Sequence, residues 1–302
     1  MVSAADRRST DRRSADRRSA DSRPLHPRAV VDRHPVASYV LVTFAFSWTV
    51  WALGFVAFRG TAAGFVSVVL GGFGPPLGAV VVRRTRGEPV VSWLRERLRV
   101  RGVAPRWFLL ALAVPLAFTV VQTAAFAADG ATLSPSLVLA RLPAYLGSLV
   151  FVFLAGGGQE EFGWRGLMLP RIQAPRGPYV ASLAVGVVWA LWHLPLYVLP
   201  GAIYASRPFA SYVFVPIAFS FVLTWLYNRS GRALLVVMLL HAGVNSAGAL
   251  IPAPASLLSS TAVVTQYQLV EAGAALLVLA VVLAVSGREA LDFRGDGEST
   301  AG

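Results

Sequence analysis

Residues 156–165 read GGGQEEFGWR and follow directly on a strongly apolar run from Leu146 to Ala155. If the stretch is helical, Glu161 and Arg165 lie four positions apart on one face and can form an ion pair. Glu160 is turned about 100° away from Glu161 on such a helix and has no local partner of this kind. The pattern therefore predicts that Glu161 is paired with Arg165, whereas Glu160 has no charged partner and is available for another function.

The composition indicates what surrounds these charges. The chain has 302 residues, of which 56% are hydrophobic and only 14% are charged, and its mean hydropathy is +0.61. These values are typical of an integral membrane protein rather than a soluble domain. A charged side chain at bilayer depth costs about 2.5–3.5 kcal/mol on insertion scales, so charges inside apolar runs are candidate functional groups. The absence of cysteine excludes disulfides and thiolate metal sites.

The two ends of the chain are polar. A five-residue repeat that starts at Asp6 runs through an arginine-rich stretch, and a period of five fits neither a helix nor a strand. Residues 1–35 are therefore predicted to be a disordered cytosolic tail that fixes topology, with binding to anionic lipid headgroups as the alternative. A second polar cytosolic tail is expected at 287–302. The two tails flank a membrane domain at 36–286.

Eight apolar runs are each close to the roughly 20 residues that cross a bilayer as a helix. The sequence therefore predicts an all-α, polytopic membrane protein with about eight transmembrane helices around a polar cavity. The fourth run is the least regular, because Arg141 and Pro143 lie near its start. The predicted spans are 36–58, 62–82, 107–128, 138–157, 179–199, 211–228, 233–251 and 268–286.

The arginines predict an orientation. All 27 basic residues are arginine, and with a cytosolic N-terminus only Arg59, Arg141 and Arg207 fall in outer segments. This asymmetry follows the positive-inside rule and puts both termini in the cytosol at the cell membrane. It accounts for the net charge of +12 without a nucleic-acid partner. Residues 83–106, where arginines interleave with apolar residues, are expected to form an interfacial amphipathic helix.

Two histidines lie inside apolar runs. His193 is followed by Pro195, which cannot donate to the carbonyl of Leu191, so the helix is expected to break there and expose polar backbone beside the imidazole. His241 and Asn245 share a helical face among small residues that allow close approach of a helix or a substrate. Their depths on the predicted topology do not match that of Glu160 unless helices are broken near Gly156.

Taken in order, Glu160-Glu161-x-x-x-Arg165, Trp189-x-x-x-His193 and His241-x-x-x-Asn245 resemble the signature of the CPBP intramembrane proteases. This family is also called the CAAX protease or Abi family and includes the type II CAAX prenyl endopeptidases. The resemblance covers about 146–249. Trp189 departs from it by standing where the family usually has Phe.

The resemblance implies a role for each matching position. Glu160 would activate water as general base with His193 beside it, and Glu161 and Arg165 would orient the site. His241 and Asn245 would stabilise the oxyanion. The implied substrate is a peptide or protein, membrane-associated or lipidated.

The metal question is open at this point. No His-Glu-x-x-His motif is present, but Glu160, His193 and His241 have the residue types of a three-ligand Zn²⁺ site. Metal-free catalysis by the glutamate is the other option.

Two other functions are compatible with the same residues. A non-proteolytic membrane scaffold or bacteriocin-immunity protein would keep the fold, and a proton-coupled transporter would also use buried Glu, His and Arg. An internal repeat would favour a transporter, and the hydropathy pattern has none. The protease interpretation makes a geometric prediction. Both histidines should lie within one bridging water of Glu160, Asn245 should face the same cavity, and the cavity should open inward or sideways into the inner leaflet.

Overall fold

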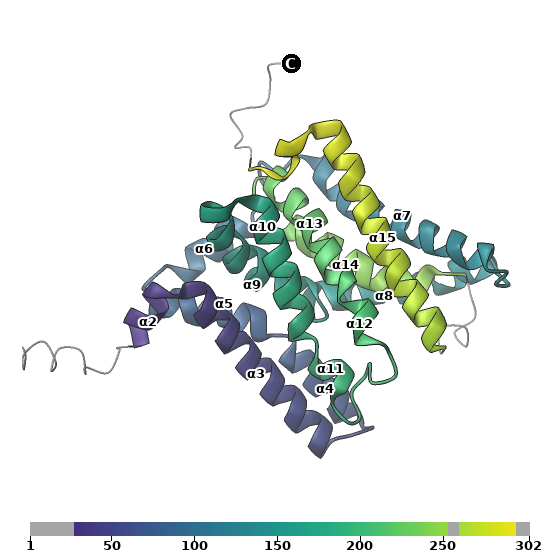
Figure 1. The fold of residues 1–302 in the computed structure, drawn as a ribbon, viewed down its shortest axis with the longest axis horizontal. Helices are drawn as coiled ribbons and strands as arrows, with labels where there is room; N and C mark the ends of the chain where they lie inside the picture. The colour runs from purple at the N-terminus through teal and green to yellow at the C-terminus, as the bar shows by residue number, and fades with distance from the viewer. Residues whose placement is uncertain (1–26, 253–259, 294–302) are drawn as a thin grey trace, which may run out of the picture.

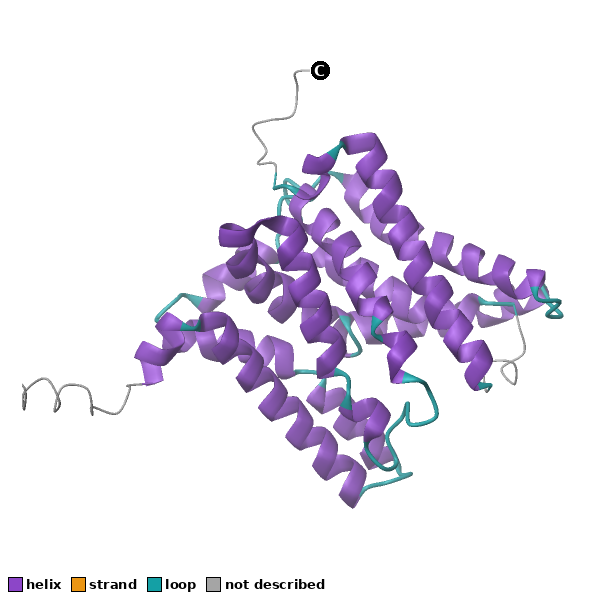
Figure 2. Ribbon diagram, in the orientation of Figure 1, coloured by secondary structure: helices purple, strands orange, loops and turns teal. Residues whose placement is uncertain are grey.

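The computed structural model describes residues 27–252 and 260–293, and this part of the chain contains helices and loops without a strand (Figures 1 and 2). The all-α prediction is confirmed. Figure 1 shows α3, α10, α13 and α15 running with a similar tilt, while α7 and α8 extend to the right. The main helices are α2 (Pro27–Arg33), α3 (Pro35–Ala57), α4 (Ala62–Gly71), α5 (Gly74–Thr85), α6 (Val90–Arg97), α7 (Pro105–Ala128), α8 (Ser136–Ala155), α10 (Leu169–Trp192), α13 (Phe214–Arg229), α14 (Leu234–Ala247) and α15 (Thr261–Ser286).

Six continuous helical runs in the described ranges are long and apolar enough to cross a bilayer: Pro35–Ala57, Ala62–Thr85, Pro105–Ala128, Ser136–Val198, Phe209–Arg229 and Thr261–Ser286. The run Ser136–Val198 is 63 residues long and contains more than one helix. A further apolar helix, Leu234–Leu250, is shorter. Each of the eight predicted apolar runs therefore coincides with helix, and the chain is a multi-pass membrane protein. The number of crossings, eight, stays a prediction.

A helical hairpin decides how the middle of the chain is placed. α10 contains one non-helical residue, Gly177, with φ 77° and ψ 168°. Glycine takes this conformation without a steric penalty, and Pro175 and Pro178 on either side disfavour a continuous helix. The chain turns back at Gly177, which returns Trp189 to the level of Glu160. The mismatch of depths that the sequence suggested is therefore removed, because residues 159–176 are helix rather than an inner loop.

The predicted tail boundaries differ from the structure. Residues 1–26 lie outside the described residues, but Pro27–Arg33 forms α2 instead of continuing a disordered tail. Arg86 anchors this helix through an ion pair to Asp32, at 3.2 Å. At the other end Arg288–Leu291 is a 3-10 helix (η5), and the buried carbonyl of Leu291 accepts a 2.6 Å hydrogen bond from Asn228.

Glu88 pairs with three arginines at the arginine-rich end of the molecule. Its carboxylate is contacted at 2.9 Å or less by Arg83 and Arg86, at the end of α5, and by Arg171 on α10. Next to this cluster Trp93 of α6 is buried, and the Arg83 guanidinium lies over its ring at 4.7 Å. The predicted interfacial helix exists as α6, although it ends at Arg97.

We expect Glu88→Gln to lower the thermal stability of the purified protein at neutral pH. Partial burial raises the pKa of the Glu88 carboxyl, but hydrogen bonds from Arg86 and Arg171 outweigh it, so the pKa lies below its usual value. The stabilisation is thus complete above the pKa of the unfolded chain and is lost as pH falls through the folded-state pKa. Because the pairs are partly exposed, the loss should be about 1 kcal/mol or less.

Thermal unfolding in detergent across a pH series measures this effect. The difference between wild type and Glu88→Gln should shrink in acid. The control is Glu96→Gln, an exposed acid on the following helix α6, and it should change the unfolding temperature little at any pH. A difference that grows as pH falls would contradict the account.

Candidate active site

A glycine turn separates α8 from the short helices that carry the two acids, η1 (Gly158–Glu160) and α9 (Glu161–Gly163). Gly157 has φ 152°, which favours glycine. The side chain of Gln159 holds the turn, because its Oε1 accepts from the Gly157 N–H at 2.9 Å while its Nε2 donates to the Gly72 carbonyl at 3.3 Å. Gln159 therefore ties the turn to the junction of α4 and α5.

The predicted pair between Glu161 and Arg165 is present and fully buried. Arg165 Nη1 donates to both carboxylate oxygens, at 3.0 and 3.1 Å, and both side chains have no exposed surface. Arg165 Nη2 donates to Ser220 Oγ of α13 at 3.1 Å. The arginine belongs to a π-helical turn, Trp164–Met168 (η2), and such turns are frequent at functional sites. Arg165 thus connects the hairpin to α13 through its hydrogen bond to Ser220.

His241 binds Glu161 rather than Glu160. Its Nδ1 lies 2.8 Å from Glu161 Oε1, and a carboxylate only accepts, so Nδ1 carries the proton. The ring is buried, 1% exposed, and packs edge-on against Trp189 with ring centroids 5.0 Å apart. Glu161 is therefore shared by one arginine and one histidine.

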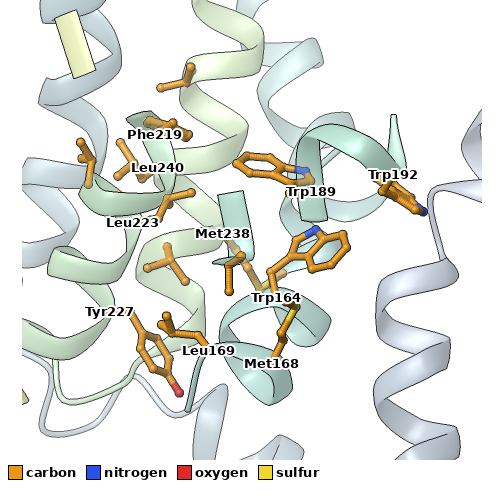
Figure 3. Packing of buried hydrophobic residues seen from close by; sticks show 14 of the residues in the cluster. Trp164, Met168, Leu169, Trp189, Trp192, Phe219, Leu223, Tyr227, Met238 and Leu240 are labelled. Atoms are coloured by element: carbon orange, nitrogen blue, oxygen red, sulfur yellow. The ribbon is translucent and has the colours of Figure 1, made fainter. Parts of the chain in front are cut away.

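Glu160 has two hydrogen-bond partners that the sequence analysis did not predict. The indole N–H groups of Trp164 and Trp189 both donate to its Oε2, at 3.1 and 2.9 Å. Figure 3 shows the two indoles close together, one from the turn after the acids and the other from the returning arm of α10. No hydrogen bond joins Oε1 to any described residue, so that oxygen is available for another molecule.

His193 lies where α10 breaks. The helix ends at Trp192 and α11 (Pro195–Val198) starts at the proline, as predicted. His193 Nδ1 lies 3.0 Å from the Trp189 carbonyl, which only accepts, so Nδ1 carries the proton and Nε2 is left without one in the neutral ring. The carbonyl of Trp192 accepts a hydrogen bond from Trp48 Nε1 at 2.9 Å, so this backbone oxygen has a partner where the helix ends.

Glu160, His193 and Asn245 line one cavity of about 370 Å³. Asn245 is exposed there, and its Nδ2 donates to the Gly156 carbonyl at 3.4 Å. Glu161, Arg165 and His241 do not line the cavity and stand behind its wall. The other lining residues include Trp51, Phe65, Val68, Val69, Gly72, Phe151, Val152, Gln159, Trp192, Tyr197, Ile203, Tyr204, Arg207, Tyr212, Gln268 and Glu271.

The lining residues can be compared with the predicted topology, which places the opening inward or sideways into the inner leaflet. Apart from Gln159 and Glu160, none of them belongs to a segment predicted to be inside, namely 83–106, 159–178, 229–232 or 287–302. The segment 200–210, which connects two predicted spans on the outer side, contributes Ile203, Tyr204 and Arg207 instead. Buried residues 164–169 of the helix hairpin follow directly after the acids. The direction in which the cavity opens relative to the membrane stays a prediction.

Comparison with known proteins points to the same segment. Residues 141–247 match the family described as type II CAAX prenyl endopeptidase Rce1-like. This segment is therefore similar to the CAAX protease family. All six predicted site residues lie inside this range, and the resemblance seen in the sequence is confirmed.

A curated relative also matches. Over 104 residues the chain is 24% identical to CAAX prenyl protease 2 of Methanococcus maripaludis. The matching part covers 32% of this chain and 38% of that relative. The likeness therefore concerns the CAAX-protease segment, and the chain matches well under half of the relative's length.

The CAAX-protease segment does not gather the predicted metal ligands. Among residues 27–252 and 260–293, no three His, Asp or Glu side chains come together as a metal site. His241 presents Nδ1 to Glu161, and Glu160 uses Oε2 for two indoles. Because these side chains do not come together, the set of Glu160, His193 and His241 does not fit Zn²⁺ as arranged.

The sequence analysis did not predict the contacts of four residues in the CAAX-protease site: Gln159, Trp164, Trp189 and Ser220. A signal existed for Trp164, because it lies four residues after Glu160, the same spacing that predicted the pair between Glu161 and Arg165. Gln159 and Ser220 act through contacts with residues 87 and 55 positions away, which no local pattern contains.

We expect Gly157→Ala to lower activity by more than tenfold. A Cβ at this position would lie 2.7 Å from Asn245 Nδ2 and 2.9 Å from His241 Nε2, and the positive φ adds strain. Gly147→Ala on α8 is the matched control, because a Cβ there meets nothing within 4 Å. Cleavage rates normalised to folded protein measure the effect, and equal rates for the two variants would contradict it.

Proposed function

We propose that the chain is an intramembrane endopeptidase in which Glu160 activates the attacking water. The observation that carries the proposal is the state of its carboxylate. It is 5% exposed, lines the cavity, and is held through one oxygen by two indoles while the other oxygen has no protein partner. A fixed carboxylate with one free oxygen is what a general base requires.

The attacking water has two acceptors in this arrangement. Glu160 Oε1 takes one of its hydrogens, and the unprotonated Nε2 of His193, on the same cavity, accepts the other. The water oxygen then attacks the peptide carbonyl carbon while its proton moves to Glu160. Asn245 Nδ2 donates to the oxyanion that forms. When the intermediate collapses, the C–N bond breaks and the Glu160 carboxylic acid returns its proton to the leaving amine.

Glu161, Arg165 and His241 orient this site without touching the water. Since the Nδ1 proton of His241 is used by Glu161, its Nε2 can donate to the oxyanion only when the ring is protonated. We therefore assign the main oxyanion contact to Asn245. The proposed substrate is a peptide or protein, membrane-associated or lipidated, and the proposed location is the cell membrane with both termini in the cytosol.

The proposal predicts hydrolysis without a metal. Activity of the purified protein should be unchanged after dialysis against EDTA and 1,10-phenanthroline, because Glu160, His193 and His241 do not come together as a metal site in the described part of the chain. Loss of activity that returns on adding Zn²⁺, but not Mg²⁺, would assign the reaction to a metal and overturn the mechanism above.

Cleavage of a quenched fluorescent peptide library by the purified protein in detergent tests the function itself. A protease should cleave members of the library and lose this activity on Glu160→Gln. A scaffold, an immunity protein or a transporter would cleave none of them. The CAAX-protease segment keeps all six signature residues, which favours the protease over a scaffold of the same fold.

A further inference from the structure

A second cavity, of about 100 Å³, lies between α10, α13 and the turn that follows α13. None of its lining residues also lines the cavity beside Glu160. Ala174 in its wall is exposed, so the second cavity is accessible from the surface of the protein. Its lining residues are Pro170, Gln173, Ala174, Tyr227, Asn228 and Arg232.

Two of the lining side chains are buried and carry a polar atom without a partner. The Tyr227 hydroxyl and Asn228 Oδ1 make no hydrogen bond to any described residue, although Tyr227 is only 1% exposed and Asn228 has no exposed surface. In Figure 3 the Tyr227 hydroxyl points away from the labelled apolar side chains. Buried polar groups almost always have a partner, and where the protein supplies none, a bound water, ion or ligand is expected.

The amide of Asn228 is held in one orientation. Its Nδ2 donates to Gln173 Oε1 at 3.0 Å and to the Leu291 carbonyl at 2.6 Å. Asn228 Oδ1 is therefore a fixed acceptor, and a molecule bound beside it must supply a donor.

Arg232 lines the same cavity in a strained backbone conformation. Among residues 27–252 and 260–293 it is the one non-glycine residue with a positive φ, 63°. Glycine would avoid the steric cost of this conformation, and such strain is concentrated at functional sites. The Arg232 N–H donates to the Tyr227 carbonyl at 2.8 Å, and the guanidinium lies over the Phe293 ring at 4.0 Å. The chain thus keeps an arginine beside the cavity at a position that suits glycine.

The charge around the cavity favours an anion. The charges of Arg97 on α6 and of Arg232 act on the Tyr227 hydroxyl, and Glu96 acts on it less. An arginine binds phosphate oxygens through paired, charge-assisted hydrogen bonds, and basic pockets between membrane helices hold phosphate headgroups. A ligand that satisfies every group in the wall therefore has anionic acceptor oxygens and at least one hydroxyl donor.

We propose that this cavity binds a phosphate group that carries hydroxyl groups, as in a glycerophosphate. The phosphate oxygens accept from Arg232 and Tyr227, and a hydroxyl of the ligand donates to Asn228 Oδ1. The cavity volume of about 100 Å³ is several times the roughly 10–15 Å³ that one water requires, so a larger polar molecule has room. Two sources share this chemistry, the headgroup of phosphatidylglycerol and soluble glycerol 3-phosphate. The inference does not depend on the proposed proteolytic function.

Thermal unfolding of the full chain in nanodiscs measures this binding. In phosphatidylcholine nanodiscs, part of the lipid is replaced by phosphatidylglycerol or by phosphatidylmethanol, which has the same phosphodiester charge and no hydroxyl. In a separate arm, glycerol 3-phosphate is added to nanodiscs of phosphatidylcholine alone. A ligand that binds only the folded chain raises its unfolding temperature, so phosphatidylglycerol should raise it more than phosphatidylmethanol does. A rise with glycerol 3-phosphate and not with phosphatidylglycerol would identify the soluble molecule as the source of the phosphate.

Two variants assign the binding to this cavity. Arg232→Gly removes the guanidinium and should still fold, because glycine suits the backbone conformation; the apparent affinity for the phosphate source should fall at least about tenfold. Tyr227→Phe removes a hydroxyl that has no protein partner and should lower the affinity about threefold or more. Arg101→Gln, which removes an exposed arginine on the turn after α6, is the matched control for charge and should keep the wild-type affinity.

Two results would overturn the inference. If phosphatidylglycerol raised the unfolding temperature no more than phosphatidylmethanol, and glycerol 3-phosphate did not raise it, the cavity would hold water only. If Arg232→Gly and Tyr227→Phe both kept the wild-type response, the phosphate would bind elsewhere on the chain. Because no peptide is cleaved in this experiment, its outcome is independent of the library assay that tests the proteolytic function.

Discussion

Glu160→Gln is expected to abolish peptide hydrolysis, lowering the cleavage rate by at least about 100-fold, while the protein stays folded. General-base catalysis typically contributes 10²–10⁴ in rate, and an amide has no lone pair that accepts the proton of water at neutral pH. The fold should survive because the amide oxygen can still accept from the indoles of Trp164 and Trp189. Initial rates on the peptide library, with thermal unfolding in the same detergent, measure both effects.

Glu271→Gln is the matched control for this experiment. Glu271 lines the same cavity from α15 and has no hydrogen bond to either indole, so the same substitution there should cost less than tenfold. If Glu160→Gln retained activity within tenfold of wild type, Glu160 would not be the base. If both variants lost activity equally, the effect would belong to the charge of the cavity rather than to proton transfer by Glu160.

The sequence predicted the parts of this site that depend on local spacing. The pairing of Glu161 with Arg165 follows from a separation of four residues on a helix, and the break after His193 follows from Pro195. The apolar runs predicted the positions of the helices, because a helix that crosses a bilayer needs about 20 consecutive apolar residues. The assignment of His193, His241 and Asn245 to one catalytic site came from the family resemblance.

The remainder depended on contacts between distant elements. The predicted spans 138–157 and 179–199 leave the residues between them as an inner connection, whereas the chain forms a helix hairpin there that turns at Gly177. The assignment of His241 to Glu161 instead of Glu160 required the rotation of α14 about its axis, which the sequence does not contain.

The indole donors to Glu160 were not predicted for a different reason. Spacing rules for a buried acid concern charged partners, and an indole N–H carries no charge. Two such donors nonetheless satisfy one carboxylate oxygen and leave the other free. A neutral pair of donors orients the base without supplying a counter-ion, in contrast to Arg165 beside Glu161.

Glu161→Gln should lower the stability of the folded protein as well as the rate of peptide cleavage. The substitution removes the only carboxylate that contacts Arg165 among the described residues, and the guanidinium has no exposed surface. Breaking a buried pair by removing one partner costs about 3–5 kcal/mol, because the remaining charge is left uncompensated. His241 loses its charged partner as well. We therefore expect lower yield of folded protein, a lower thermal unfolding temperature in detergent, and loss of activity.

A double variant separates the cost of the orphaned charge from the loss of side-chain contacts. Glu161→Gln with Arg165→Met removes both charges and keeps similar volume, so its unfolding temperature should lie above that of Glu161→Gln alone. Both variants should be inactive, because His241 no longer has a carboxylate to fix its ring. If the double variant were less stable than the single one, Arg165 would stabilise the hairpin through Ser220 and the Trp189 ring instead, the latter 5.2 Å from the guanidinium carbon. The order of the two unfolding temperatures therefore decides whether the buried ion pair or the contacts of Arg165 with Ser220 and Trp189 contribute more to stability.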